Sequence, residues 1–296
     1  MLGSEVAMLE EMLRDIGPDR VIERIGIEQR LKARRADLAA LGPEQPRLLL
    51  TFRGDPVERN RAIHAEFGGK AAALFSEALA TVSASLSTQL GSAGPLPQVA
   101  ERHLRIVGTA VGSFGFEMEL PPPNPEQLPG LLPDMSDAVN STLALIREAS
   151  AGDEDALSEV ISATHPRAAA KVQEFVRHVI DRNALFGVTF GEQRVAIHDV
   201  AEGRVVLDSL STDQIQQDDV TAVGELIGVL PEGRRFEARR DDGEVIRGRI
   251  DRSLDAHALS LKWLRVPAAL HLRETRVRSA RPSYVLLEMT KAGPDA

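Results

Sequence analysis

The chain has no cysteine, one tryptophan and one tyrosine, and aromatic residues make up only 4% of its 296 residues. Without cysteine it has no disulfide, no thiolate metal site and no cysteine nucleophile. With few aromatic side chains it has few platforms on which nucleic-acid bases could stack. The absence of cysteine suits a reducing compartment, so we expect a cytoplasmic protein.

Long apolar runs are also missing. None approaches the roughly 18–20 residues that cross a bilayer, and the first stretch, MLGSEVAMLEEML, carries glutamates but no basic leader. We therefore expect no membrane association and no signal peptide. The hydrophobic fraction of 43% and the charged fraction of 27% are those of an ordinary folded protein. A chain of this length is expected to form two or three domains.

The net charge of −9 disfavours a dedicated nucleic-acid binder, because neutralising phosphates requires an excess of lysine and arginine. This charge is unevenly spread. Residues 228–282 hold 13 Lys and Arg against 8 Asp and Glu, a net charge of +5, so the rest of the chain carries −14. The C-terminal part is therefore predicted to be an electropositive lobe on an acidic body.

Residues 1–46 have the apolar spacing of two helices separated by Gly17-Pro18. In the second of these helices the apolar residues fall on heptad positions, although the pattern is short for a coiled coil. Two interpretations remain open. The segment is either a helical hairpin that packs on its own domain, or a dimerisation arm in which residues 1–42 form a homo-oligomer.

Residues 47–121 are predicted to form a small α/β domain. The stretch RLLLTFRGDPV (47–57) alternates like a strand and ends in a turn, residues 59–87 have helical periodicity, and HLRIVGTAV (103–111) is a second strand. The prolines of PPPNPEQLPGLLP exclude regular helix and central strand, so residues 122–133 are predicted to be a stiff linker.

Residues 134–220 are predicted to form a helical segment followed by a β-meander. Asp153 and Thr164 are candidate helix N-caps. The meander is expected in GVTFGEQRVAIH and GRVVLDSL, where the apolar period changes from 3.6 to 2. The three predicted helices span 135–150, 153–163 and 166–183.

Residues 221–291 are predicted to form a small β-barrel of the SH3 or OB type, because short strands separated by turns follow one another. In RRFEARRDDGEVIRGRID, Phe236 and Ala238 face one way, Asp242-Gly243 turns the chain, and Ile246 returns. The sequence thus predicts an α+β protein. It combines an N-terminal helical hairpin and small α/β region, central helices with a β-meander, and a C-terminal small β-barrel.

The stretch GTAVGSFGFEMEL (108–120) permits three interpretations. A phosphate loop would need a following helix and a Gly-Lys-Ser/Thr string, and the sequence has neither. A nucleophile turn around Ser113 would need a helix and a partner histidine. We therefore predict a structural bend between two strands, in which Gly112 or Gly115 has a positive φ. Three apolar residues should then be buried: Phe116, Met118 and Leu120.

No histidine lies in a recognised metal-binding motif. Glu174, His178 and Asp181 would share a helical face, which we interpret as a solvated, self-paired surface rather than a metal site. Kinase, Rossmann and P-loop motifs are missing from the sequence. We therefore expect no catalytic, cofactor-binding or metal-binding residues.

Arginines in the predicted barrel are the strongest electrostatic feature. They would form a solvated surface of mixed charge, a nucleic-acid face, or a surface for an acidic protein partner. Interleaved acids such as Glu237 and Asp241 would repel a uniform phosphate backbone but match a protein surface of mixed charge. The series comprises Arg234, Arg235, Arg239, Arg240, Arg247, Arg249 and Arg252. The candidate partner-binding residues are Phe114, Arg234, Arg235, Arg239, Arg247 and Arg249.

Two strings, LTFRGDPVERNRAIHAEF and GTAVGSFGFEMEL, resemble a group of uncharacterised bacterial proteins. That group shares an L-x-F-x-G-x-P-V turn and a GSFGFE string, and the resemblance covers residues 20–121. It has no known activity to transfer, so the resemblance implies no functional residue for this chain.

Three functions are compatible with these observations. We expect first a non-enzymatic adaptor or regulatory subunit that binds other proteins in a bacterial cytosolic complex. The alternative is a subunit of a bacterial defence or stress system, such as antiviral defence, that contacts nucleic acid through the arginine-rich barrel. A second alternative is a hydrolase of unrecognised type.

Each function predicts a different surface. An adaptor predicts an exposed apolar patch. A nucleic-acid module predicts an arginine face free of acids, and an enzyme predicts a pocket where carboxylates and a histidine converge.

Overall fold

The computed structural model of the chain describes residues 8–9, 12–13, 20, 26–33, 47–59, 61–87, 94–96, 102–110, 114–122 and 133–291. The chain divides into two units, Met1–Pro46 and Arg47–Ala296. In the first unit, Leu9 and Leu31 are buried in helical segments. Most of the predicted hairpin or dimerisation arm lies outside the described residues.

The second unit contains all the named strands. Its first part comprises β1 (Leu48–Gly54), β2 (Val57–Glu58), β3 (Ala62–Ile63), α3 (Ala65–Ser87), β4 (Arg105–Thr109) and β5 (Phe114–Glu119). The central part comprises α4 (Met135–Ala151), α5 (Glu154–Ser162), α6 (Pro166–Ile180), β6 (Ala184–Phe190), β7 (Gln193–Ala196), α7 (Val200–Ser209) and the 3₁₀ helix η2 (Thr212–Gln214). The last part comprises β8 (Ile215–Leu230), β9 (Arg235–Arg240), β10 (Val245–Ile250), α8 (Ala256–Trp263), β11 (Pro267–Val277) and β12 (Ser283–Lys291). The protein is therefore α+β, as the sequence predicts.

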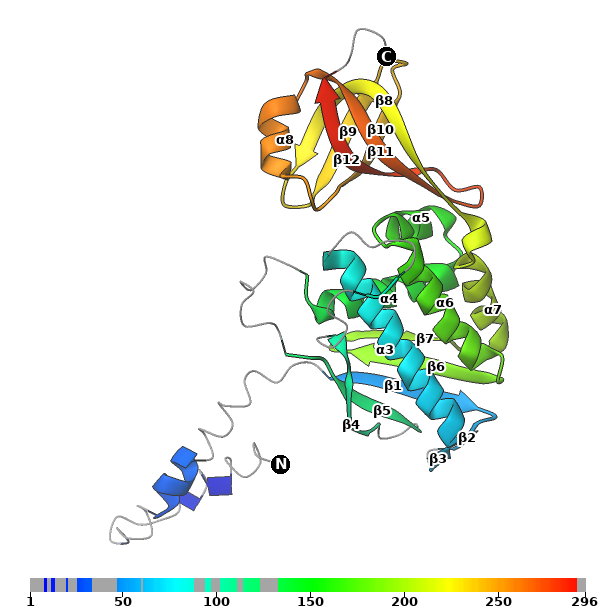
Figure 1. Cartoon of the computed structure of the whole chain (residues 1–296). Helices are drawn as coiled ribbons and strands as arrows, with labels where there is room; N and C mark the ends of the chain where they lie inside the picture. Colours follow the sequence, from blue (N-terminus) through cyan, green and yellow to red (C-terminus); the bar gives the residue numbers. More distant parts are fainter. Residues whose placement is uncertain are drawn as a thin grey trace. The chain divides into compact units, whose positions relative to one another are not determined.

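The first sheet has β1 at its centre. The strand order is β4-β5-β1-β6-β7, and all neighbouring strands are antiparallel. Helices α3, α4 and α6 lie on one side of this sheet (Figure 1), and Leu48, Leu50 and Phe52 of β1 are buried in the core. Because β1 pairs with β5 along one edge and with β6 along the other, the segments 47–121 and 134–220 build one sheet and one core.

The glycine-rich stretch forms part of this sheet. Strand β5 forms the second half of the stretch, in the place where a phosphate loop or a nucleophile turn requires a helix. Met118 and Leu120 are buried, and Phe116 is half-buried against the core, whereas Gly112 lies outside the described residues. The prediction of a positive φ is wrong for Gly115. This residue must be glycine for another reason: a Cβ there would collide with the backbone of Leu50 on β1.

One strand of the predicted meander is a helix. The stretch GRVVLDSL (203–210) lies mostly in α7, which begins after the N-cap Asp199. A Cβ at Gly203 would collide with Ile180, so the glycine lets α7 approach α6 closely. The buried residues of this stretch, Gly203, Val206 and Ser209, are spaced three apart, which is the period of an amphipathic helix rather than of a strand.

One predicted helix start and one predicted N-cap also differ, whereas α6 begins at Pro166 as predicted. The helix predicted from residue 59 begins at Ala65, because the preceding residues pair as the hairpin β2–β3 and Arg59 has a φ of 54°. Helix α6 is capped by His165, whose Nδ1 accepts a hydrogen bond from the Arg167 amide, rather than by Thr164. The predicted N-cap Asp153 is confirmed, since its side chain accepts from the Ala156 amide.

The C-terminal strands close into a barrel in the order β10-β12-β11-β8-β9, which confirms the predicted small barrel. Strands β10 and β12 are parallel and the other pairs are antiparallel. Helix α8, which the sequence patterns did not predict, lies between the third and fourth strands of the barrel. This arrangement is that of an OB-type barrel. The predicted Asp242-Gly243 turn is present, with Gly243 at a φ of 87°.

The hairpin between β11 and β12 anchors the barrel to the helices. Val277 and Ala280 belong to the core formed by the helices and the first sheet. The Ser158 hydroxyl on α5 donates to the carbonyl of Thr275 over 3.3 Å, and the amide of Arg281 donates to Asp155 over 2.9 Å. The barrel and the helical section therefore share buried surface.

Candidate functional site

The predicted arginines lie on the outer surface of the barrel and at its ends. Side chains along a strand alternate between the two faces, and the inward residues of β9 and β10 include the buried Phe236, Ala238 and Ile246. The outward residues are Arg235, Glu237 and Arg239 on β9, and Val245, Arg247 and Arg249 on β10. Arginines and acids therefore share one face.

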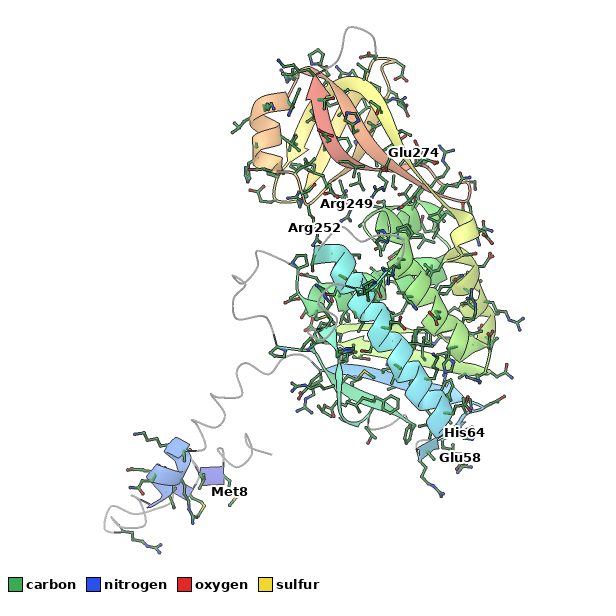
Figure 2. The ribbon with its side chains drawn as sticks, in the orientation of Figure 1. Met8, Glu58, His64, Arg249, Arg252 and Glu274 are labelled. Carbon is green, nitrogen blue, oxygen red and sulfur yellow. The ribbon has the colours of Figure 1, made fainter. Side chains whose placement is uncertain are left out.

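Every arginine of the series has a partner within the chain. The ion pairs are Arg235–Glu159, Arg249–Glu159 (3.8 Å), Arg239–Glu225 (3.4 Å), Arg240–Glu244 (2.9 Å) and Arg247–Glu237. Arg234 and Arg252 instead donate to backbone carbonyl groups, of Leu254 (2.8 Å) and Leu86 (2.6 Å). Figure 2 labels Arg249 and Arg252 of the series. Burial lowers the pKa of Arg252. Exposed pairs of this kind stabilise a fold by only about 0–1 kcal/mol each, but they neutralise the local charge.

This pairing bears on nucleic-acid binding. In OB-type barrels, the face of the second and third strands and the loop between the fourth and fifth strands bind oligonucleotides. Here that face carries Arg–Glu pairs, and that loop is anchored in the core of the helices through Ala280. The predicted arginines therefore do not form an arginine face free of acids.

Phe114 lies apart from the arginines. It is the first residue of β5, in the first sheet, and is half-buried opposite Phe52 of β1. The arginines belong to the barrel and to its loops. The structure therefore divides the candidate partner-binding residues between two sheets rather than bringing them together.

A second surface of the barrel was missed by the sequence patterns. The end of α8 and the residues after it expose three apolar side chains: Leu261 (91% exposed), Leu264 (39%) and Val266 (41%). Lys262 and Arg265 are exposed between them. We call these five residues the docking patch. The signal in the sequence is the string LSLKWLRVP, in which more apolar residues follow one another than an eight-residue helix can bury.

The docking patch is held by contacts on its inner side. Trp263 and Leu259 are buried in the barrel core, and Asp255 caps α8 by accepting from the amides of His257 and Ala258. The amide of Arg265 donates to the carbonyl of Leu226 on β8 over 2.7 Å. The exposed side chains are therefore presented by ordered backbone.

The cations of the docking patch differ from the other barrel cations. Lys262 lies over the Trp263 ring, 4.8 Å from its centroid. In the described part of the chain, neither Lys262 nor Arg265 has a carboxylate within ion-pair distance. The docking patch is therefore both apolar and positively charged, without the compensating acids found on β9 and β10.

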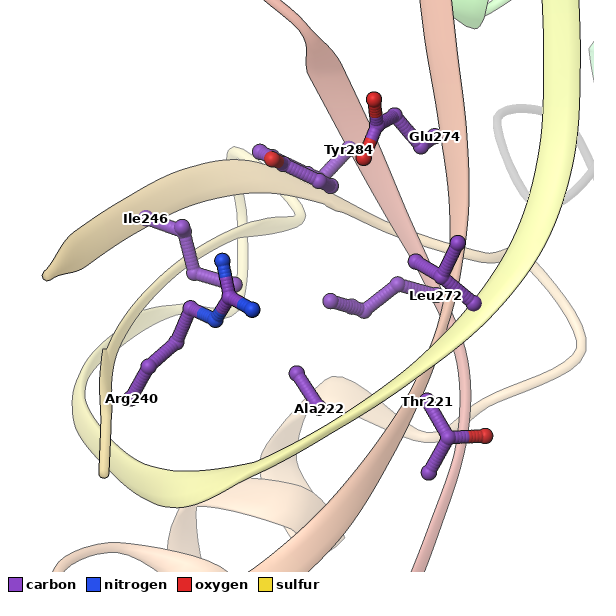
Figure 3. A pocket seen from close by; sticks show the side chains of 8 residues that line it. Thr221, Ala222, Arg240, Ile246, Leu272, Glu274 and Tyr284 are labelled. Atoms are coloured by element: carbon purple, nitrogen blue, oxygen red, sulfur yellow. The ribbon is translucent and has the colours of Figure 1, made fainter. Parts of the chain in front are cut away.

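A pocket of about 120 Å³ lies in the wall and interior of the barrel. Its polar lining comprises Arg240, Glu274, Tyr284 and Thr221, whose hydroxyl bonds to His271, and its apolar lining includes Ile246 and Leu272 (Figure 3). Burial, and next the charge of Glu274, raise the pKa of the Tyr284 hydroxyl. No histidine lines this pocket. The pocket therefore does not combine a carboxylate with a histidine, the combination that the hydrolase alternative predicts.

The α6 face of Glu174, His178 and Asp181 is only partly the predicted solvated, self-paired surface, because Glu174 is paired but His178 is half-buried against Phe67. Lys171 donates to Glu174 over 2.8 Å, and the His178 ring stacks on Phe67 with centroids 5.4 Å apart. Burial lowers the pKa of His178. Within the described ranges, no three His, Asp or Glu residues are grouped closely enough to hold a metal ion. Nor does any described helix combine the length and the apolar character that crossing a membrane requires.

Comparison with known proteins gives no match: no protein-family model, no curated protein and no solved structure is significantly similar to this chain. The function must therefore be argued from the surfaces themselves.

Proposed function

We propose that the chain is a non-enzymatic adaptor of the cytosol that binds an acidic segment of another protein through the docking patch. The observation that carries this proposal is the exposed apolar and cationic surface of residues 261–266. Leu261, at 91% exposure, is the most exposed large apolar side chain among the described residues. Clustered apolar residues on a surface are typical of protein interaction sites.

The chemistry of the docking patch favours an acidic partner with apolar residues. Covering Leu261 and its two apolar neighbours would contribute about 25 cal/mol for each Å² removed from water. Lys262 and Arg265 would attract carboxylates, which raises the association rate and sets the orientation of the partner. The phosphate backbone of a nucleic acid would also be attracted by these cations, but it has no apolar surface to cover Leu261.

The other functions have weaker support. The arginines of β9 and β10 are paired with acids, which disfavours a nucleic-acid face. The barrel pocket has no histidine, which disfavours a hydrolase that uses a histidine base. The adaptor is thus the function that the surfaces support best.

The proposal can be tested by purifying the tagged full chain from its host and quantifying the proteins that accompany it. Leu261→Ser combined with Arg265→Glu should release at least one protein that the wild type retains. A matched control is Ile106→Ser combined with Arg194→Glu, which changes an exposed apolar residue and an exposed cation in the first sheet. Identical sets of proteins with both double variants would contradict the proposal.

A further inference from the structure

The polar groups of the barrel pocket stand at inward positions of the barrel wall. Arg240 continues the alternation of the buried Phe236 and Ala238 along β9. Glu274 likewise continues the alternation of Leu270 and Leu272 along β11. Inward positions of a small barrel are normally apolar, since charged groups lose hydration there. Arg240 and Glu274 therefore form a polar layer next to the apolar interior of the barrel.

These opposite charges do not neutralise each other. Arg240 pairs with Glu244 over 2.9 Å, in its own hairpin, and Glu274 pairs with Arg276 over 2.9 Å, on its own strand. Within the described residues, no ion pair joins Arg240 to Glu274. In Figure 3 the Arg240 guanidinium and the Leu272 side chain point toward each other across the space, with Glu274 and Tyr284 above them. The Arg240 guanidinium and the Glu274 carboxylate thus line the same pocket without forming an ion pair across it.

Tyr284 completes the polar lining. It is 9% exposed and pairs with Glu274 across β11 and β12. Burial and the Glu274 charge raise its pKa, so the hydroxyl stays protonated at neutral pH. A protonated phenol donates a hydrogen bond to a carboxylate. In the described part of the chain the hydroxyl has no hydrogen-bond partner.

The size of the pocket limits its occupant. Pockets for drug-sized molecules and cofactors have volumes of roughly 300–1,000 Å³. The barrel pocket, with about 120 Å³, is smaller than these and suits an occupant much smaller than a nucleotide. Ala222, Ile246 and Leu272 give part of its lining an aliphatic character.

We propose that the barrel pocket binds a small zwitterion, namely a free α-amino acid with a short aliphatic side chain. Its carboxylate accepts hydrogen bonds from Arg240 and Tyr284, and its ammonium group donates to Glu274. Its side chain lies on Ile246 and Leu272. Charge-assisted hydrogen bonds at both ends would hold the ligand, because Arg240 and Glu274, each paired on its own hairpin or strand, present opposite charges to the two ends of a zwitterion. The site is independent of the docking patch.

The test compares three probes on the wild-type full chain by NMR titration near neutral pH. L-valine should bind saturably. The probe 3-methylbutanoate, which lacks the ammonium group, and isobutylamine, which lacks the carboxylate, should each bind at least about tenfold more weakly, as the loss of one charge-assisted hydrogen bond requires. No saturation with L-valine up to about 10 mM, or equal affinities for valine and either analogue, would overturn the proposal.

Two variants then assign the charges. Glu274→Gln should abolish the preference for valine over 3-methylbutanoate, and Arg240→Gln should abolish the preference for valine over isobutylamine. Arg247→Gln, on the outer face of the same hairpin, is the control and should keep both preferences. Circular dichroism establishes that each variant is folded. Unchanged preferences in a folded Glu274→Gln variant would also overturn the proposal.

Discussion

Close backbone approach makes Gly115 indispensable to the first sheet. A Cβ at this position would collide with the carbonyl oxygen of Leu50, whereas a Cβ at Gly69, in α3, would meet nothing within 4 Å. We expect Gly115→Ala to lower the free energy of unfolding by about 1–3 kcal/mol, the usual cost of overpacking. Gly69→Ala should raise it by about 0.5–1 kcal/mol, because alanine is the better helix former.

Urea denaturation of the two glycine variants is the measurement. Equal effects of the two substitutions would contradict the close approach of β5 to β1. A stable Gly115→Ala variant that loses its binding partners would instead make this stretch a functional site.

His178 gives the protein a predicted sensitivity to acid. Its Nε2 lies 3.3 Å from the Phe67 carbonyl oxygen, and burial lowers its pKa. The unfolded chain, in which the pKa of histidine is about 6.5, therefore binds a proton more readily than the folded chain. The free energy of unfolding should consequently fall as the pH drops below about 6.5.

Substitution of His178 tests this sensitivity. His178→Gln should flatten the dependence of the free energy of unfolding on pH between about pH 7 and pH 5, because the titrating group is gone. The control is the same substitution at His257, an exposed residue of α8. Denaturation curves at several pH values provide the measurement, and equal slopes for wild type and His178→Gln would disprove the role of His178.

Single residues of the site were predictable only in part. The alternation of Phe236 and Ala238 extends by two residues to Arg240, so an inward arginine was within reach of the sequence pattern. Its neighbours in the pocket, Glu274 and Tyr284, come from strands whose register no local pattern sets. The pair between Arg235 and Glu159 likewise joins residues that are 76 positions apart.

At the scale of elements, local signals predicted most helices and strands correctly. Helical periodicity predicted α4, α5 and α6, the N-cap Asp153 marked the start of α5, and the turn Asp242-Gly243 marked the β9–β10 hairpin. The stretch 203–210 was wrongly predicted as strand, because its two adjacent valines favour strand locally. Packing of Gly203 on Ile180 favours the helix instead, and only the tertiary structure supplies that contact. Helix α8 was not predicted, because its eight residues are too few to show a clear helical period.

The β11–β12 hairpin couples the barrel to the helical section. Trp263 is the single tryptophan and lies in the barrel core, so its fluorescence reports the barrel, whereas far-ultraviolet circular dichroism chiefly reports the helices. Since Val277 and Ala280 belong to the core of the helices, the two signals should change together on denaturation of the wild type.

Ala280→Glu should separate the two transitions, because it places a charge in the shared core. Ala201→Glu, at an exposed position of α7, should leave them together. Different midpoints already in the wild type, or coincident midpoints in Ala280→Glu, would contradict the coupling.

At the scale of the whole molecule, the first unit is predicted to promote self-association. The prediction rests on the two heptad-like apolar stripes in residues 1–42. Light scattering on the full chain and on a chain that starts at Pro46 should give a smaller number of subunits for the shorter chain. An unchanged number of subunits would contradict the hypothesis that residues 1–42 form a dimerisation arm.

The whole molecule is also predicted to bind nucleic acid only weakly. Its net charge is −9, and the arginines of β9 and β10 are paired with acids, so a phosphate backbone meets few free cations. A fluorescence-anisotropy titration with DNA and RNA should give a Kd in the non-specific range of about 10⁻⁴–10⁻⁶ M near physiological salt. Submicromolar binding that is lost in Arg247→Glu combined with Arg249→Glu would favour the nucleic-acid alternative.

The central claim is that the docking patch binds an acidic protein segment, and site-specific photo-crosslinking tests it most directly. A photoreactive amino acid replaces Leu261 in one full-length chain and Ile106, an exposed residue of the first sheet, in another. After irradiation in a lysate of the host, the chain labelled at 261 should carry a second polypeptide joined through an acidic segment. The yield should fall in high salt, since the Debye length shortens from about 10 Å at 0.1 M to about 3 Å at 1 M. No polypeptide adduct at 261, or the same adducts at 261 and 106, would contradict the claim.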